Sequence, residues 1–238
     1  MKIRFMKATS MKTIAVIPAR AGSKRIKNKN IKLLSGKPLI CYTIETALKI
    51  KQIDKIFIST DIDQLEKIVE TYKDDRISLI RREKSLSGDY ITTEAVLIDV
   101  LEKIDSYQTV QGVITLSPTS PFRNVDVIEK CIQLFYQKRA DSVFTISVEK
   151  LRIGFWDKKT LRFSFKNKNM LPEMHLVEPE TYENPAVYVT KPSVLFGKRF
   201  VIGEVNYGVP IDKISGLDIN DMEDWAIAEA IIEKRLVG

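Results

Sequence analysis

The 238 residues can bury one sizeable core, and the apolar (44%) and charged (29%) fractions are ordinary for a globular protein. The formal net charge of +7 leaves a nucleic-acid partner open, but the 38 basic residues are interleaved with 31 acidic ones and no RNA-reading signature occurs. A basic surface with a cationic site for a small anion is therefore the favoured interpretation. No apolar run approaches the length of about 20 residues that a membrane span requires, so we expect no membrane partner.

Strand-like and helix-like segments alternate along the first part of the chain. The predicted strands cover residues 14–17, 55–59, 77–80, 112–116 and 142–147. The predicted helices cover residues 39–50, 63–72, 92–104 and 126–138, with Pro38 opening the first and Asp61 or Asp63 capping the second. This alternation is typical of right-handed βαβ units, so we expect an α/β fold with a mostly parallel sheet flanked by helices. We expect one domain over residues 12–238.

The alternation breaks after Glu149. Residues 151–183 begin with a stretch rich in aromatic, lysine and asparagine residues, which predicts an inserted arm rather than another βα unit. Trp156, Phe163 and Phe165 are expected to form the core of this arm or a dimer contact. A strand over 186–190 and a helix over 225–235 close the chain.

The most informative segment is residues 14–36, IAVIPARAGSKRIKNKNIKLLSG. A buried strand ends at Pro18, and a turn of small residues follows with many lysine and arginine side chains. Backbone N–H groups and cations in such a loop suit a polyphosphate. The loop has neither the GxxxxGK[ST] spacing of a P-loop nor the GxGxxG spacing of a dinucleotide site, so these two common phosphate sites are excluded.

Polar clusters follow four of the predicted strands. They begin at Arg20, Ser59, Arg81 and Ser117. Because ligands bind at the carboxyl ends of strands in an open α/β sheet, we expect these clusters to share one rim.

A second informative stretch is SGLDINDMEDW over residues 215–225. Asp218 and Asn220 alternate around Ile219, so their oxygens share a face in an extended chain and suit Mg²⁺. Capping of the following helix by Asn220 or Asp221 is the alternative, and it is compatible with metal binding.

The cysteines and the single histidine point away from several chemistries. Cys41 and Cys131 lie far apart without zinc-site spacing, which favours small core residues in a reducing, cytoplasmic compartment. Nothing near His175 supports a Ser-His-Asp or Cys-His mechanism. Residues 1–11 lack the apolar stretch of a secretory signal, and we expect them to be a disordered extension.

Taken in order, the motifs IPARAGSKRIKNKNI, LSGKPLICYTIETAL, FISTD, SPTSPFR, ENPAVYV and GLDIND resemble those of the acylneuraminate cytidylyltransferases, or CMP-sialic acid synthetases. Enzymes that activate legionaminic and pseudaminic acids belong to the same group. The resemblance implies a Rossmann-like nucleotidyltransferase, usually a homodimer, with a dimerisation arm near residues 151–183. It implies transfer of CMP from CTP to the anomeric hydroxyl of a 2-keto-3-deoxy sugar acid, with Mg²⁺ as cofactor and pyrophosphate as product.

The same resemblance implies roles for particular residues. Catalytic roles fall to Arg20, Lys29 and Asp218. The nucleotide is expected to contact Ala19, Arg20, Ala21, Gly22, Ser23, Lys29, Arg81, Ser87 and Asp89, with Asn30 close by. The acceptor is expected to contact Ser117, Thr119, Ser120, Arg123 and Asn184, with Arg123 as one candidate for its carboxylate, and the metal ligands would be Asp218 and Asn220.

Three positions depart from the family pattern. Ser117 stands where a glutamine is usual, Pro185 replaces a glycine, and Asn220 replaces the second aspartate of a DID motif. These changes favour an unusual acceptor sugar. Two alternatives to this function remain open: a Kdo-type or other sugar nucleotidyltransferase, and a nucleotide-binding protein without turnover. A third hypothesis, a nucleic-acid-binding module, is supported by the net charge alone.

Overall fold

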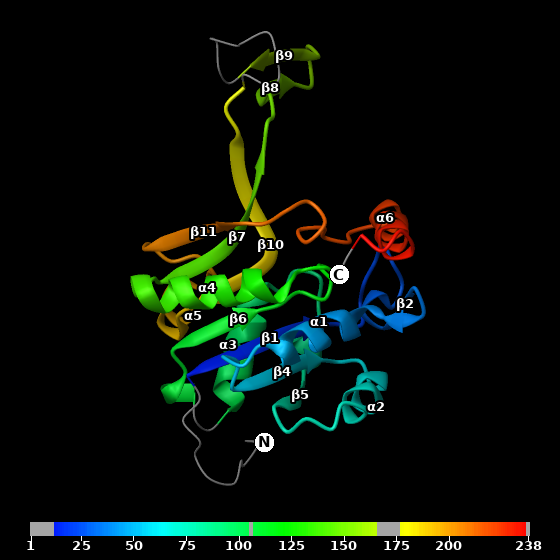
Figure 1. Ribbon diagram of the computed structural model, residues 1–238, viewed down its shortest axis with the longest axis vertical. Helices are drawn as coiled ribbons and strands as arrows, with labels where there is room; N and C mark the ends of the chain where they lie inside the picture. Colours follow the sequence, from blue (N-terminus) through cyan, green and yellow to red (C-terminus); the bar gives the residue numbers. More distant parts are fainter. Residues whose placement is uncertain (1–11, 105–106, 166–176, 237–238) are drawn as a thin grey trace.

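A seven-stranded sheet runs through the body of the protein (Figure 1). The computed structural model describes residues 12–104, 107–165 and 177–236, so the predicted extension at 1–11 and His175 lie outside the described residues. The spatial order of the strands is β11 (Asn206–Pro210), β7 (Ser142–Glu149), β10 (Glu180–Thr190), β6 (Gly112–Thr115), β1 (Thr13–Ala19), β4 (Lys55–Thr60) and β5 (Ile77–Arg81). Only β10 runs antiparallel to its neighbours, which confirms the mostly parallel sheet.

Helices cover both faces of the sheet. One face packs against α1 (Leu39–Lys49), α2 (Gln64–Glu70) and α4 (Val125–Lys138). The other packs against α3 (Thr93–Lys103) and α5 (Pro192–Lys198). Residues Ile14 to Ile17 of β1 are fully buried, as expected for a central strand covered on both sides. No helix in the described part of the chain is long and apolar enough to cross a bilayer.

A third, smaller core brings the C-terminal region to the loop after β1. There α6 (Met222–Glu233) inserts Trp225 beside Ile26, Leu39 and Ile219. Asp221 opens α6 with a capping box, accepting the N–H groups of Glu223 and Asp224. Asp221 therefore caps α6, and the side chain of Asn220 is not used for capping.

Most of the predicted helices and strands occur within three residues of their expected bounds, but β10 begins at Glu180 rather than at residue 186. The cap predicted for α2 is wrong, because Asp63 makes no side-chain capping bond and the Asp61 carboxylate accepts the N–H of Ala21 instead. Neither α5 nor β11 was expected. The short elements β2 (Leu33–Leu34), β3 (Lys37–Pro38), η1 (Lys29–Ile31), η2 (Lys84–Leu86) and η3 (Tyr107–Thr109) complete the body.

An arm projects from the body (top of Figure 1). Strands β7 and β10 extend beyond the rest of the sheet, and β8 (Gly154–Asp157) pairs with β9 (Arg162–Phe165) at the tip. Where β10 enters the body, its pairing with β7 shifts register between Asn184 and Tyr188. Pro185 lies in this bulge, where a missing backbone N–H costs no ladder hydrogen bond.

Candidate active site

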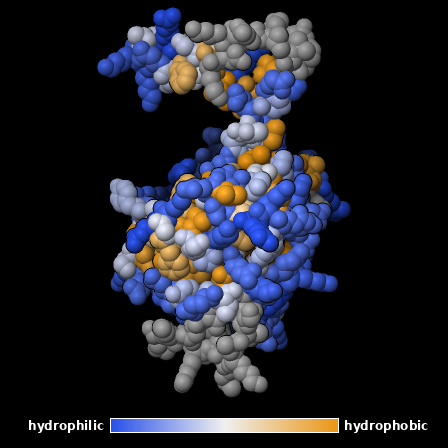
Figure 2. Space-filling model, turned by 90° about the vertical axis from the view of Figure 1, so that its left-hand side faces the viewer, coloured by the Kyte–Doolittle hydropathy of each residue, from blue (hydrophilic) through white to orange (hydrophobic). Residues whose placement is uncertain are grey.

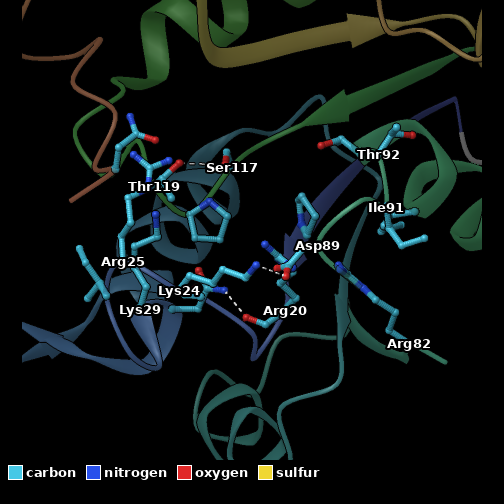
Figure 3. Close-up of a pocket in the computed structure, with 18 residues that line it drawn as sticks. Arg20, Lys24, Arg25, Lys29, Arg82, Asp89, Ile91, Thr92, Ser117 and Thr119 are labelled. Carbon is cyan, nitrogen blue, oxygen red and sulfur yellow. Dashed lines mark hydrogen bonds and ion pairs between the residues drawn. The ribbon is translucent and has the colours of Figure 1, made fainter. Parts of the chain in front are cut away.

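A polar cavity of about 430 Å³ opens at the carboxyl ends of the central strands. Its walls come from the loop after β1, the loop between β5 and α3, the loop after β6, and Asn220 (Figure 3). The strand order reverses here, since the chain adds β4 on one side of β1 and β6 on the other. This is the position at which open α/β sheets bind ligands. The four polar clusters lie at one edge of the sheet, as expected, and those after β1, β5 and β6 line the cavity.

The loop after β1 places several cations around the cavity. Arg20, Lys24, Arg25 and Lys29 all line it. The Asp89 carboxylate bridges two of them, with Oδ1 2.9 Å from Nη1 of Arg20 and Oδ2 2.6 Å from Nζ of Lys24. These hydrogen bonds hold the pKa of Asp89 below its usual range. The cations are thus paired with a carboxylate that a polyphosphate would have to replace.

Lys29 connects this loop to the C-terminal region. Its Nζ donates to the carbonyl oxygen of Ile219 over 2.7 Å. Burial lowers the pKa of Lys29, and the nearby carboxylate of Asp218 opposes that shift. Asn30 fixes the turn by donating to the Arg20 carbonyl oxygen over 2.9 Å. The site therefore holds a partly desolvated ammonium group close to a carboxylate.

The end of β4 supports the cavity rather than lining it. The Asp61 carboxylate accepts the N–H of Ala21 over 2.7 Å. Ser59 accepts hydrogen bonds from Arg82, at 3.2 Å through its hydroxyl and at 2.9 Å through its carbonyl oxygen. These contacts fix the loop after β1 and the side chain that follows β5.

The predicted metal ligands lie together. The Asn220 amide nitrogen donates to Oδ2 of Asp218 over 2.9 Å, while Oδ1 of Asp218 is buried and has no hydrogen-bond partner among the described residues. A buried carboxylate oxygen without a partner fits a hard cation or a water. No group of three His, Cys, Asp or Glu side chains capable of holding a metal occurs within the described residues. Such an ion would therefore need ligand phosphates and water to complete its coordination.

The loop after β6 forms another wall of the cavity. Ser117 and Thr119 line the cavity, and their hydroxyl groups lie 3.0 Å apart. The Thr119 carbonyl oxygen accepts the N–H of Ile219 over 2.7 Å. This bond joins the wall to the segment that carries Asp218 and Asn220.

Comparison with known proteins identifies the family. A family model described as Cytidylyltransferase matches residues 14–180. The chain belongs to the cytidylyltransferase family. It is 30% identical to the N-acylneuraminate cytidylyltransferase of Escherichia coli over 94% of this chain and 53% of that protein, so it spans about half the length of that relative.

Two further comparisons agree. The chain is 29% identical to the CMP-N,N'-diacetyllegionaminic acid synthase of Legionella pneumophila over 94% of this chain and 97% of that protein. A solved structure of CMP:2-keto-3-deoxy-manno-octonic acid synthetase, complexed with CTP, superposes with a TM-score of 0.66. It covers 94% of this chain and 99% of that one at 16% identity, which shows a shared fold. The resemblance found in the sequence motifs is confirmed.

Some residues expected to contact the nucleotide lie elsewhere. Arg81 points outward and pairs with Asp63 and Glu66, while its neighbour Arg82 lines the cavity. Successive side chains at the end of a strand face opposite sides, so a shift of one residue exchanges the two arginines. Ser87 does not line the cavity, because its hydroxyl donates to the Glu83 carbonyl oxygen.

Ala19, Ala21 and Gly22 of the first loop do not line the cavity. Ala19 ends β1 and is buried, and the N–H of Ala21 is already bound by Asp61. Gly22 keeps space open, since a Cβ atom there would have only Nη1 of Arg20 within 4 Å, at 3.8 Å. Ser23 lines the cavity as expected.

Three residues expected at the acceptor are buried outside this cavity. Arg123 is 2% exposed and donates to Oγ1 of Thr43 and to the Ser117 carbonyl oxygen, so its guanidinium is a tether for the loop after β6. Burial lowers its pKa to about 9, which leaves it charged at neutral pH. Ser120 is fully buried. Neither Arg123 nor Ser120 lines this cavity, so their contact with the acceptor stays a prediction.

Asn184 also has a different position from the one expected. It is 6% exposed, and its amide nitrogen donates to Oγ of Ser147 and to the Gly216 carbonyl oxygen, each at 3.0 Å. Its amide oxygen accepts the N–H of Ala186 over 3.1 Å. Asn184 therefore joins the bulge in β10 to the segment leading to Asp218 and is not on the cavity wall.

Several cavity residues were not singled out from the sequence. They are Lys24, Arg25, Ile91, Thr92, Thr93 and Val96, whereas Arg82 belongs to the polar cluster expected after β5. Lys24 and Arg25 belong to the GSKR motif, which was a usable signal. The residues of the loop before α3 have no comparable signal, because their position depends on how α3 packs against the sheet.

Proposed function

We propose that the chain transfers CMP from CTP to the anomeric hydroxyl of a sialic-acid-like 2-keto-3-deoxy sugar acid and releases pyrophosphate. The observation that carries the proposal is the arrangement of Arg20, Lys24 and Lys29 in one cavity that Asn220 also lines, with the unpaired buried oxygen of Asp218 close to Lys29. The relatives from Escherichia coli and Legionella pneumophila, an N-acylneuraminate cytidylyltransferase and a CMP-N,N'-diacetyllegionaminic acid synthase, support the donor and the acceptor class.

The cations serve the leaving group. Attack at the α-phosphorus breaks the α–β phosphoanhydride bond and places negative charge on pyrophosphate. Arg20 and Lys24 would exchange Asp89 for the phosphate oxygens, and Lys29, whose Nζ contacts the Ile219 carbonyl oxygen, would approach them from the side of Asn220. Stabilising the charge that develops in the transition state is the main contribution a protein makes to such a transfer.

Asp218 and Asn220 fit a Mg²⁺ ion. The Asn220 amide nitrogen faces Asp218, so the amide oxygen is its donor atom for a ligand. Bound there, the ion would supply charge stabilisation on the phosphate oxygens. The acceptor brings its own nucleophilic hydroxyl, which explains why the reaction needs no activated serine or cysteine of the protein.

We also propose a homodimer formed through the arm. Phe155 and Trp156 are 71% and 57% exposed on β8, and Phe163 and Phe165 of β9 are exposed as well. In Figure 2 apolar side chains of the arm lie beside strongly hydrophilic ones, above the narrow stalk. Large apolar side chains gathered on a projecting hairpin are typical of an interaction surface. We place the protein in the cytoplasm, where CTP is available and where the buried thiols of Cys41 and Cys131 stay reduced.

Pyrophosphate release tests the proposal. The protein is incubated with CTP, Mg²⁺ and single members of a panel of sialic-acid-like and Kdo-type acids. We expect release that depends on one acid, and we expect Arg20→Ala and Asp218→Ala each to lower turnover by roughly tenfold or more, as for loss of one charge-stabilising group. Arg81→Ala, which removes an arginine outside the cavity, is the matched control and should keep its rate. CTP binding without release for any acid would indicate a nucleotide-binding protein instead.

A further inference from the structure

A second cavity, of about 470 Å³, lies between α1 and the start of α4. Residues from 212–215 and Leu236 close it on the remaining sides. It shares no lining residue with the candidate active site, because the loop after β6 contributes Ser117 to the one cavity and Phe122 to the other. A cavity of this size is in the range that holds a small organic molecule.

The carboxylates that line this second cavity already have partners. Oε2 of Glu45 lies 2.6 Å from Nζ of Lys37. Oδ1 of Asp212 accepts the N–H groups of Ile214 and Ser215, each over 3.0 Å. The negative charges of the wall are therefore compensated within the protein, and neither carboxylate needs a cation from outside.

The positive groups of the wall are not all used. Arg123 is 2% exposed, and its buried Nε has no hydrogen-bond partner in the described part of the chain. Lys49, the last residue of α1, is exposed and forms no ion pair with any described residue. A buried donor without an acceptor costs free energy, so a ligand that supplies an acceptor would be stabilised. Guanidinium and ammonium groups form their strongest hydrogen bonds with anionic oxygens.

The start of α4 adds backbone donors to the same wall. Asn124 caps this helix by accepting the N–H of Val127 over 2.9 Å. The N–H groups of Val125 and Asp126 come before that bond and have no acceptor among the residues described. Asn124 and Val125 line the cavity together with Arg123. A helix N-terminus beside a guanidinium suits a phosphate group, because free N–H groups and positive charge act on the same oxygens.

We infer that this second cavity binds the phosphate group of a small metabolite, held by the start of α4, Arg123 and Lys49. Phe122 and the ring of Tyr42 line the same cavity and offer apolar contact to the rest of such a molecule. The inference concerns a site apart from the candidate active site, so it does not rest on the proposed function.

An NMR titration with inorganic phosphate tests the inference, because each backbone amide reports on its own surroundings. We expect the amides of Val125 and Asp126 to follow a binding curve separate from that of the loop after β1. K49E should weaken the curve at α4 by about two- to twentyfold, as for one exposed attraction replaced by an equal repulsion, and leave the other curve unchanged. K51E changes an exposed lysine that does not line the cavity, so it is the matched control and should leave both curves unchanged.

Three results of this titration would overturn the inference. The first is an α4 start whose amides do not respond to phosphate. The second is a response that K49E and K51E weaken equally, which would show only a general attraction of anions to a basic surface. The third is a response of these amides to a sialic-acid-like acid but not to phosphate, which would assign the cavity to the acceptor.

A covalent probe supplies a second measurement. Thr46 lines the cavity, and Cys41 and Cys131 are buried, so T46C offers an accessible thiol. The variant is labelled with one of two methanethiosulfonate reagents, which carry either a sulfonate or a trimethylammonium group. We expect the sulfonate-labelled protein to melt about 1–4 °C above the trimethylammonium-labelled one, because the anion lies near Arg123 and Lys49. Equal melting temperatures, or a higher one with the cationic label, would overturn the anion preference of the cavity.

Discussion

Replacing Arg123 distinguishes a tether from a substrate contact. Its guanidinium is almost fully buried and donates to Thr43 and to the Ser117 carbonyl oxygen. Hydrogen bonds from a charged group contribute about 1.5–3 kcal/mol each. Arg123→Leu would remove both and leave two acceptors buried, but it would also remove the cost of desolvating the charge. We expect a net loss of about 2–4 kcal/mol in the free energy of unfolding.

A loss of that size has a clear thermal signature. For a chain of this length it lowers the melting temperature by roughly 5–15 °C, measured by calorimetry or circular dichroism. Arg123→Lys, which keeps the charge but not the two-pronged geometry, should fall between the wild type and Arg123→Leu. Because the tether holds Ser117 at the cavity wall, any loss of activity should affect the KM for CTP and for the acid together. A higher KM for the acid alone, at an unchanged melting temperature, would refute this reasoning and return Arg123 to the acceptor site.

Three further changes test the cations paired with Asp89, the protonation of Lys29 and dimerisation through the arm. Asp89→Asn frees Arg20 and Lys24 and should tighten pyrophosphate binding by about two- to fivefold, as for two weak exposed ion pairs. The control Asp63→Asn should leave pyrophosphate binding unchanged. Unchanged affinity in Asp89→Asn would show that Asp89 does not compete with phosphate. Lys29 must be protonated to attract phosphate, and burial lowers its pKa. Pyrophosphate affinity should therefore fall as the pH rises through that lowered pKa, whereas Lys29→Arg should retain its affinity at higher pH. Parallel pH profiles of the wild type and Lys29→Arg would contradict this. The double change Phe155→Asp and Trp156→Asp should convert a dimer to a monomer in light scattering without lowering the melting temperature, because both side chains are exposed; a persisting dimer would place the interface elsewhere.

The alternation of apolar strand-like runs with helix-like segments predicted most of the sheet, because each βα unit repeats this local pattern of apolar residues. The strands next to β1 are fully buried and therefore almost purely apolar, which makes them easy to recognise. In contrast, β11 has the sequence NYGVP and joins the edge of the sheet by pairing with β7. Glycine and proline disfavour a strand locally, so only the long-range pairing reveals it.

The candidate site shows the same limit. The motif positions correctly placed Arg20, Lys29 and Asn220 at one cavity, because short loops after strands carry their side chains to the rim. Arg123 and Asn184 are polar residues in equally clear motifs, yet their partners come from α1 and from the segment before Asp218. A motif shows that a residue matters but not whether its partner is a ligand or a distant part of the chain.

The central claim is that the cavity joins CMP to a sugar acid. The most direct measurement is mass spectrometry of the product formed from CTP, Mg²⁺ and the accepted acid, together with the amount of pyrophosphate released. We expect one CMP-linked sugar acid for each pyrophosphate released, and we expect Asp218→Ala to form neither product. Pyrophosphate released with free CMP and unchanged acid, or no product with any acid of the panel, would contradict it.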